Sequence, residues 1–255
     1  MITIPPFRWR QQLFTGNGTF VVPDGVELIY ADMVNGGDGG GGGYIGSTGG
    51  GGAGGTAGIA IVQFPLAVTP GETLTVIVGA GGLGGPASSN ATPTGQAVCQ
   101  AGMTSIVGST GRIGCLNTSA AGLVQAGGSA AGGVTTTGFG TTYVPNYAGL
   151  TPVKISLGGA GGAPGANGVA TSFGGPCMSS PNHFAAGGSG AGTLGGGGAG
   201  GHNQWGKGGD GGNPNTAGAA ATGYGAGGGG GGAGLTAGAG GNGAPGFARI
   251  YWWGA

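Results

Sequence analysis

One stretch of the sequence decides the fold: residues 186–246 read AGGSGAGTLGGGGAGGHNQWGKGGDGGNPNTAGAAATGYGAGGGGGGAGLTAGAGGNGAPG. Thirty of these 61 residues are glycine, and the only large apolar side chains are Leu194, Trp205, Tyr224 and Leu235. Each glycine inside a helix costs roughly 1 kcal/mol relative to alanine, so no helix is expected here. The stretch is therefore either disordered, or its backbone pairs with neighbouring segments so closely that only glycine fits.

The second outcome corresponds to a bundle of polyglycine II helices. A chain in the polyproline II conformation has no internal hydrogen bonds, so its N–H and C=O groups point outward and can pair with chains packed beside it. Collagen uses the same conformation but needs glycine at every third residue, and the spacing here is irregular. The low charge and the apolar strands near both ends argue against disorder. We therefore predict glycine rods at residues 36–58, 79–85, 122–133, 158–168, 187–201, 206–212, 223–234 and 238–246, with loops between them.

The composition limits the partners that the protein can have. Among its 255 residues, 76 are glycine, and six basic and six acidic residues give a formal net charge of zero. No basic stripe is present to bind phosphates, so nucleic acid is not an expected partner. The longest apolar stretch, residues 58–68, is too short to span a bilayer, and residues 1–10 lack the features of a signal peptide. We expect synthesis in a cytoplasm, without membrane insertion.

The reactive side chains do not suggest catalysis or a cofactor. The cysteines are three, Cys99, Cys115 and Cys177, and an odd number without a secretory signal disfavours a disulfide framework. They form no C-x-x-C motif, which disfavours a zinc site. A glycosidase needs two carboxyl groups about 5–10 Å apart, and five of the six carboxylates lie in or beside N-terminal strands and turns. We therefore expect no enzyme activity, no metal and no cofactor. The carboxylates are Asp24, Glu27, Asp32, Asp38, Glu72 and Asp210.

Strand patterns are concentrated near the two ends of the sequence, which predicts a mainly β fold with irregular segments and almost no α-helix. Residues 11–15 and 19–22 flank Gly16-Asn17-Gly18, which predicts a hairpin. A long strand is expected over residues 26–34.

A second hairpin is predicted from residues 57–68 and 73–78, which flank the turn Thr69-Pro70-Gly71-Glu72. The last strand, residues 247–253, is expected to pair with the N-terminal strands or lie near them, because these segments hold most of the large apolar side chains.

The expected organisation has three parts. Residues 1–35 form an N-terminal β segment that serves as base, and its sheet is completed by residues 57–78 and 247–253. Residues 36–246 form the glycine-rich polyglycine II region with inserted loops, and residues 247–255 form the C-terminal strand.

Several motifs near the two ends resemble a known module. Residues 18–26, GTFVVPDGV, lead into NGGDGG at 35–40 and resemble the start of the glycine-rich module of bacteriophage tail fibres. VTPGETL at 68–74 before VGAGG at 78–82, and GAPGFARI at 243–250, are similar to other parts of that module. The architecture resembles the adhesin at the tip of the long tail fibres of T-even-type phages. The resemblance implies rods that present loops to a host surface, while the N-terminal part docks on the fibre.

Aromatic and amide side chains in the predicted loops are candidates for receptor binding. Rods of glycine offer no deep core, so these rings cannot all be buried, and exposed aromatic patches tend to be binding sites. Their faces stack on sugars, although some rings could simply cap the rods. The candidates are Phe139, Tyr143 and Tyr147 in one loop, Phe173, His183 and Phe184 in a second, and His202, Asn203 and Trp205 in a third.

Aromatic residues at the two ends are candidates for attachment to the virion. Phe7 and Trp9 precede the first strand, and packing on the sheet is an equal alternative for them. Trp252 and Trp253 lie on the last strand, where at least one of them is expected in the core or in a subunit contact.

These expectations combine into a bacteriophage tail-fibre or tail-tip adhesin located in the virion tail and assembled in the host cytoplasm. Its expected partners are other phage tail proteins and a host surface glycan or outer-membrane protein, and it acts as a homotrimer or as a monomer on a trimeric fibre. The alternative is a structural virion protein of the baseplate, tail tip or capsid surface that contacts no receptor. A glycine-rich ice-binding protein could also be built from such rods, but it needs regular, flat repeats.

Overall fold

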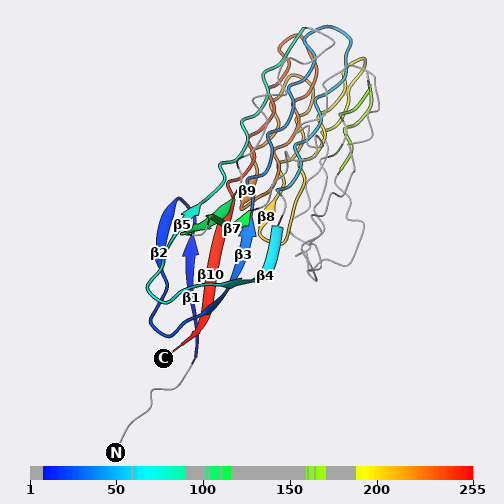
Figure 1. The fold of residues 1–255 in the computed structure, drawn as a ribbon. Helices are drawn as coiled ribbons and strands as arrows, with labels where there is room; N and C mark the ends of the chain where they lie inside the picture. Colours follow the sequence, from blue (N-terminus) through cyan, green and yellow to red (C-terminus); the bar gives the residue numbers. More distant parts are fainter. Residues whose placement is uncertain are drawn as a thin grey trace, which may run out of the picture.

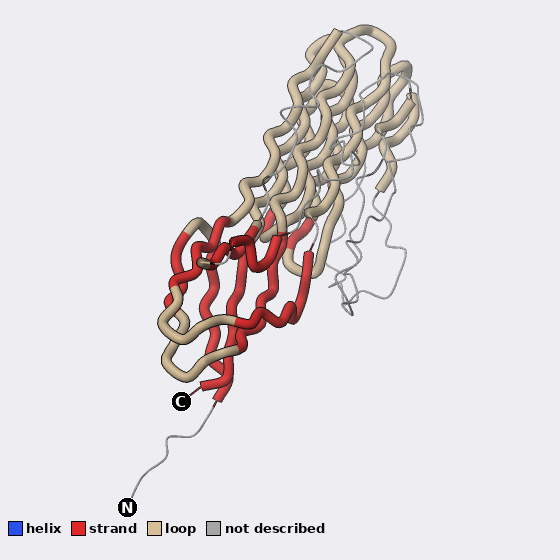
Figure 2. The backbone as a smooth tube through the Cα atoms, in the orientation of Figure 1, coloured by secondary structure: helices blue, strands red, loops and turns tan. Residues whose placement is uncertain are grey.

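Strands gather at one end of the molecule, and long extended segments without helix or strand form the other end (Figures 1 and 2). The computed structural model describes residues 8–58, 60–89, 102, 104–109, 111–115, 159, 161–163, 165–170 and 188–254. These residues form no α-helix, so none of them belongs to a helix able to cross a membrane. The prediction of a mainly β fold is confirmed for this part of the chain.

The first sheet joins segments near both ends of the sequence. Its strand order is β1 (Arg8–Phe14), β10 (Phe247–Gly254), β3 (Leu28–Val34) and β4 (Ala60–Ala67), and all neighbours are antiparallel. The expected pairing of the last strand with the N-terminal strands is confirmed, because β10 lies between β1 and β3.

The second sheet is also antiparallel, in the order β2 (Gly18–Val21), β5 (Thr73–Ile77), β6 (Ser105–Gly108) and β7 (Gly111–Cys115). Strands β6 and β7 lie inside residues 86–121, which the sequence had suggested as a loop. Two short strands, β8 (Gly206–Lys207) and β9 (Thr222–Gly223), pair with each other.

Apolar side chains from both sheets meet in one core. In β5 burial alternates, with Leu74 and Val76 inside, as a strand with one solvated face requires. Ile29 of β3 and Ile250 of β10 are completely buried in the same cluster. The sheets are therefore two layers around a shared interior, and each keeps one face outside.

Both predicted hairpins are wrong, because the chain passes from one sheet to the other at each turn. After β1 it enters β2, where Phe20 packs into the shared core. After β4 it enters β5, and the turn there bonds to Val22 instead of closing a hairpin. Val22 donates to the carbonyl of Glu72 at 2.8 Å and accepts from the N–H of Gly71 at 2.9 Å.

The glycine region is built around residues 225–234. Within it, the N–H groups of residues 227–233 donate to three neighbouring segments, and the carbonyls of the same residues accept from three others, so six segments surround it. The acceptor segments are 38–44, 195–201 and 216–219, and the donor segments are 52–58, 209–215 and 238–244. Nearly all of the polar backbone of this buried segment is thereby satisfied without a helix or a sheet.

Hydrogen bonds between these segments repeat every third residue. A pair of antiparallel segments illustrates the spacing, with distances of 2.8–2.9 Å. The N–H groups of Gly37, Gly40 and Gly43 donate in turn to the carbonyls of Ala244, Gly241 and Gly238. Burial has the same period along residues 79–87, where Gly79, Gly82 and Gly85 are buried and the residue after each is exposed.

Glycine is required in the centre by close approach of neighbouring backbones. A Cβ atom built on any of the six glycines at 227–232 would lie within 2.1 Å of a carbonyl oxygen of another segment. Real Cβ contacts are never so short, so each position excludes a side chain. None of the six has a positive φ, so space rather than a left-handed conformation selects glycine here.

Candidate functional site

The outer face of the first sheet carries a row of large polar and aromatic side chains. On β10, Arg249, Tyr251 and Trp253 alternate with the buried Ile250. Trp9 of β1 lies opposite Trp253, and Gln11 lies opposite Tyr251. Because paired residues share a face of a sheet, these side chains all lie on the side away from the core.

Four aromatic rings form a cluster on this face, which we call the aromatic cluster: Trp9, Tyr30, Tyr251 and Trp253. Trp9 contacts the other three edge to face, with centroid distances of 5.7 Å to Tyr30, 5.9 Å to Tyr251 and 5.4 Å to Trp253. Tyr30 and Tyr251 stack at 5.8 Å. Trp9 and Trp253 are still 56% and 51% exposed, so the cluster presents ring surface to solvent.

Beside the cluster, the Asp32 side chain is 2% exposed and is paired with Arg249. The Arg249 Nε donates to Oδ2 at 3.0 Å, and Nη2 donates to the same oxygen. Oδ1 accepts from the backbone N–H of Gln63 at 2.8 Å and from the Tyr251 hydroxyl at 3.3 Å. A buried carboxylate needs such partners, and both of its oxygens are occupied by these bonds.

Burial raises the pKa of Tyr251 to about 12, and the negative charge of Asp32 adds to the effect. The raised pKa keeps the phenol protonated into alkaline solution, where it still acts as a donor to the carboxylate. This part of the face is a fixed hydrogen-bonded network.

A bulge in β4 shapes the edge of the site. The register of β4 against β3 shifts between Ala31 and Met33, and Gln63 has a φ of 55°. A non-glycine residue in this conformation costs of order 1 kcal/mol or more. The bulge directs the N–H of Gln63 onto Asp32, and the Gln63 side chain is exposed.

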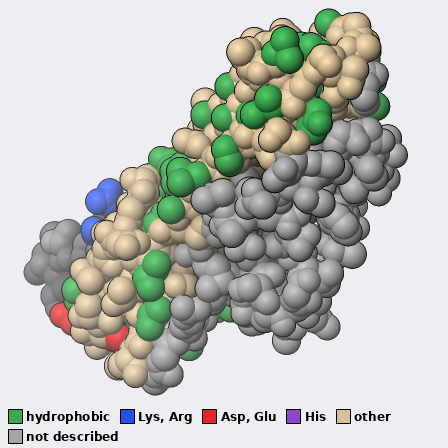
Figure 3. Space-filling view, turned by 90° about the horizontal axis from the view of Figure 1, so that it is seen from above, with side chains coloured by type: hydrophobic (Ala, Val, Ile, Leu, Met, Phe, Trp, Pro, Cys, Tyr) green, Lys and Arg blue, Asp and Glu red, His purple; other side chains and the backbone are tan. Residues whose placement is uncertain are grey.

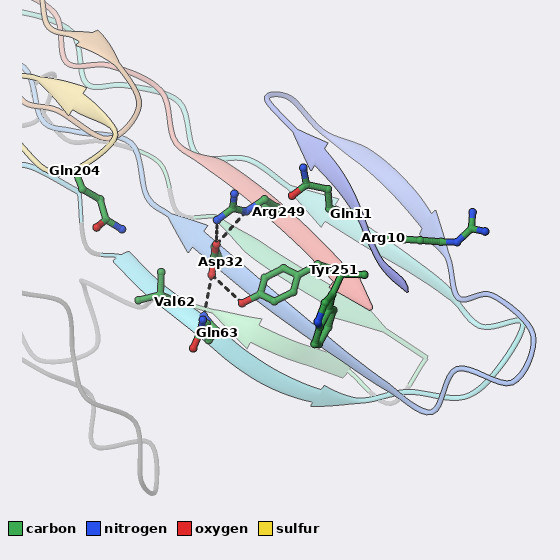
Figure 4. A pocket seen from close by; sticks show the side chains of 9 residues that line it. Arg10, Gln11, Asp32, Val62, Gln63, Gln204, Arg249 and Tyr251 are labelled. Atoms are coloured by element: carbon green, nitrogen blue, oxygen red, sulfur yellow. Dashed lines mark hydrogen bonds and ion pairs between the residues drawn. The ribbon is translucent and has the colours of Figure 1, made fainter. Parts of the chain in front are cut away.

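Together these residues line an open groove of about 730 Å³, hereafter the sheet groove (Figure 4). The Arg10 side chain extends away from the Asp32–Arg249 pair, whereas Val62 and Gln63 border the groove from β4 (Figure 4). The lining residues are Trp9, Arg10, Gln11, Asp32, Val62, Gln63, Gln204, Arg249 and Tyr251.

The sheet groove offers flat ring surface, three side-chain amides and a guanidinium group. Such a set suits hydrogen bonding and stacking rather than acid–base chemistry, because the one carboxylate is already bonded. Within the described ranges, no group of three or more His, Cys, Asp or Glu residues could hold a metal ion.

Six of the nine sequence-predicted receptor residues lie outside the described residues, as does Phe7. They are Phe139, Tyr143, Tyr147, Phe173, His183 and Phe184.

The other three predicted receptor residues do not lie on an exposed loop. His202 and Asn203 are 0% and 3% exposed, and Trp205 packs edge to face on Phe247 at 5.4 Å. Segment 195–201 leads back to the two packed sheets, hereafter the sandwich, so residues 202–205 turn at the junction between the glycine region and the sheets. The expectation of an exposed loop is wrong here, because Val34 and Phe247 supply a local apolar core that we had not foreseen.

The predicted attachment tryptophans fall into two groups. Trp252 packs against the core cluster, with its ring 5.1 Å from Phe20. Trp9 and Trp253 are exposed in the aromatic cluster. Sequence reasoning missed Gln11, Tyr30, Gln63 and Arg249, although the alternation of Arg249, Tyr251 and Trp253 along the last strand was a readable signal.

Comparison with known proteins adds the family. No curated protein matches the chain. Residues 14–253 match a family described as a glycine-rich domain. The match covers the second sheet and the glycine region, and in the first sheet it leaves out β1 except for Phe14. The chain therefore belongs to the glycine-rich domain family.

Proposed function

We propose that the glycine region is a polyglycine II bundle. The support is the repeat of three residues in its hydrogen bonds and in its burial, since this helix has three residues per turn. The absence of positive φ among residues 227–232 agrees with the same conformation. Six neighbours around residues 225–234 are what a hexagonal packing of such helices provides.

We further propose that the protein is a bacteriophage tail-fibre or tail-tip adhesin that binds a host receptor through loops held on this bundle. The observation that carries the proposal is the surrounded central segment, where carbonyl oxygens leave no room for a side chain. Such a scaffold is rigid without a hydrophobic core, and rigid presentation lowers the ordering cost of binding by small loops. The motifs near both ends that resemble phage tail-fibre modules provide the biological context.

In this proposal the attachment point lies at the end of the sandwich that faces away from the glycine region. The start of β1 and the end of β10 lie at the far end of the sandwich, away from the glycine region (Figure 1). That end is proposed to attach to another tail protein, with Trp253 and Phe7 as contacts. Trp252 is left out because it packs in the core. Trp9 lines the sheet groove and is treated below.

The described tips of the glycine region are held together by hydrogen bonds. The Thr193 hydroxyl donates to the carbonyl of Ser47 at 2.7 Å, and the N–H of Ile45 donates to the carbonyl of Ser88 at 2.9 Å. Leu235 at the next turn is 73% exposed. In the view of Figure 3, the visible charged side chains lie at the sandwich end, and the glycine region shows apolar and uncharged atoms. Such a surface suits a neutral or apolar receptor patch.

Adsorption of a fluorescent fusion protein tests the adhesin proposal. The purified fusion is expected to decorate susceptible cells and to leave resistant cells dark. Replacing residues 134–157 or 169–186 by the corresponding loops of a relative is expected to change which cells are decorated. The predicted contacts are Phe139, Tyr143, Tyr147, Phe173, His183 and Phe184. Unchanged host range after both replacements would refute the assignment of these loops.

A structural virion protein without receptor contact is the second candidate. Immunogold labelling of virions separates the two, because an adhesin is expected at the distal tip of the tail. Label on the capsid shell or along the tail tube, together with no cell adsorption, would favour the structural role.

A further inference from the structure

We propose that the sheet groove is a binding site for a neutral oligosaccharide. This goes beyond the adhesin proposal, which places receptor contact on the loops of the glycine region. It gives the sandwich a ligand of its own and gives Trp9 a role in binding that ligand.

The aromatic cluster supplies the surface on which a sugar ring can stack. Trp9 borders the sheet groove and is more than half exposed, so a face of its ring is open to solvent. Sugars present C–H groups on one face of the ring, and these pack on aromatic surface much as other apolar groups do. Exposed tryptophan surface is unfavourable in water, which makes this ring a natural anchor.

Hydrogen-bonding groups lie beside this anchor on several elements. Gln11 comes from β1, Gln63 from the bulge of β4 and Gln204 from the turn before β8. Each amide offers a donor and an acceptor, as sugar hydroxyls require. The Arg249 guanidinium has five N–H groups, of which the bonds to Asp32 use the Nε group and one from Nη2. Its side chain is 38% exposed, so it can donate to a ligand as well.

The charge of the sheet groove favours an uncharged ligand. The buried Asp32 carboxylate is paired with Arg249, so this pair has no net charge. Arg10 contributes to the lining, but its side chain extends away from the pair (Figure 4). At the buried pair an anionic sugar would meet no cation without a carboxylate partner, and among the described lining residues a cation would meet no carboxylate except Asp32, which is already bonded.

The site is also held in place before any ligand binds. Trp9 is wedged among Tyr30, Tyr251 and Trp253, and Gln63 is kept at a φ of 55° by its bond to Asp32. Strained backbone that is held by a buried partner is typical of binding sites. Little ordering is then needed on binding, and a volume of about 730 Å³ is in the range of small-molecule sites, enough for a short oligosaccharide.

Binding to an array of neutral and acidic oligosaccharides, followed by calorimetric titration of the neutral hits, tests the proposal. The full-length protein is expected to bind a neutral di- or trisaccharide with a dissociation constant below about 1 mM. Trp9→Ala is expected to weaken that binding roughly tenfold or more, and Trp9→Phe less, because a ring is retained. Gln63→Gly removes an amide at a position where glycine tolerates the positive φ, and it is expected to weaken binding too.

Val21→Ala is the matched control, because Val21 is 60% exposed on the other sheet. It is expected to leave sugar binding unchanged, and thermal melting checks that all variants fold. Absence of binding to every neutral glycan, binding to acidic glycans alone, or binding that Trp9→Ala leaves intact would each overturn the proposal. So would capture of a tail protein at the sheet groove that Trp9→Ala abolishes. Cell adsorption through the loops is measured separately, so failure here leaves the adhesin proposal standing.

Discussion

Asp32 of β3 and Arg249 of β10 are direct cross-strand partners, and the guanidinium Nε lies 3.0 Å from the carboxylate Oδ2. The Asp32 side chain is buried, whereas the Arg249 side chain is 38% exposed. The buried Asp32 carboxylate therefore depends on Arg249 for its stabilisation, whereas water can partly solvate the Arg249 side chain. The cost of removing either side differs accordingly.

Arg249→Met is expected to destabilise the fold, because it leaves the buried Asp32 carboxylate without its cation. Removing one partner of a fully buried pair costs about 3–5 kcal/mol, and partial exposure of Arg249 lowers the expected loss to about 2 kcal/mol. Urea unfolding measures it. Combining Arg249→Met with Asp32→Asn is expected to recover part of the loss, and strictly additive losses would show that the two side chains are not coupled.

Gly230→Ala is expected to destabilise the glycine region. Its Cβ would lie 2.0 Å from the carbonyl oxygen of Gly52, and backbone held by neighbours on all sides cannot move away. We expect a loss of roughly 1–3 kcal/mol or more, seen as a melting temperature lower by several degrees. Gly16→Ala is the control, because its Cβ would meet nothing within 4 Å. Equal melting temperatures for the two variants would contradict the close packing.

Thr104→Val is expected to weaken the junction between the second sheet and the glycine region. The buried Thr104 hydroxyl donates to the carbonyl of Val34 at 2.6 Å and accepts from the N–H of Gly79 at 3.1 Å. Valine has the same shape but leaves both backbone groups unpaired, at a cost of about 1–3 kcal/mol. Chemical denaturation should show this loss. Thr104→Ser keeps the hydroxyl and is expected to lose clearly less, and the reverse order would rule out the hydrogen bonds as the cause.

The Tyr251 phenol is expected to make stability fall at alkaline pH. Its folded pKa is raised to about 12, so the unfolded chain ionises first, near pH 10. Stabilisation from the protonated phenol is complete below pH 10 and is lost as pH rises toward 12. Absorbance at the phenolate band should show one of the six tyrosines titrating late, and this step should be absent in Tyr251→Phe. A late step that persists in the variant would assign it to another tyrosine.

The sequence was informative where a structural property follows directly from the type of residue. Glycine content predicted that residues 186–246 hold no helix, and the apolar alternation of residues 247–253 predicted a strand. Pairing was harder, because Gly16-Asn17-Gly18 signals a reversal of the chain but not the sheet to which the next strand belongs. The side chain of Asn17 instead accepts a bond from the N–H of Val78, 61 residues away.

The sheet groove could not be predicted from the sequence, because it too depends on which strands pair. Trp9 and Tyr30 are brought together only because β10 places Tyr251 between their strands. The bulge at Gln63 has no glycine or proline at that position to mark it. His202 illustrates the opposite error, since a polar residue in a glycine-rich stretch suggested a surface loop, and the junction buried it.

The position of residues 225–234 at the centre of their bundle has a consequence for the order in which the protein is made. The six segments that bond to this one all precede or directly follow it, and the earlier ones leave the ribosome with unpaired backbone groups. β10, which joins β1 to β3, is synthesised later still. Assembly of the glycine region and the first sheet must therefore wait until about residue 254 has emerged. It then closes loops of up to some two hundred residues at once. Long-range closure of this kind is slow. We therefore expect the newly made chain to lack both the hydrogen bonds of the glycine region and the first sheet until its synthesis is nearly complete.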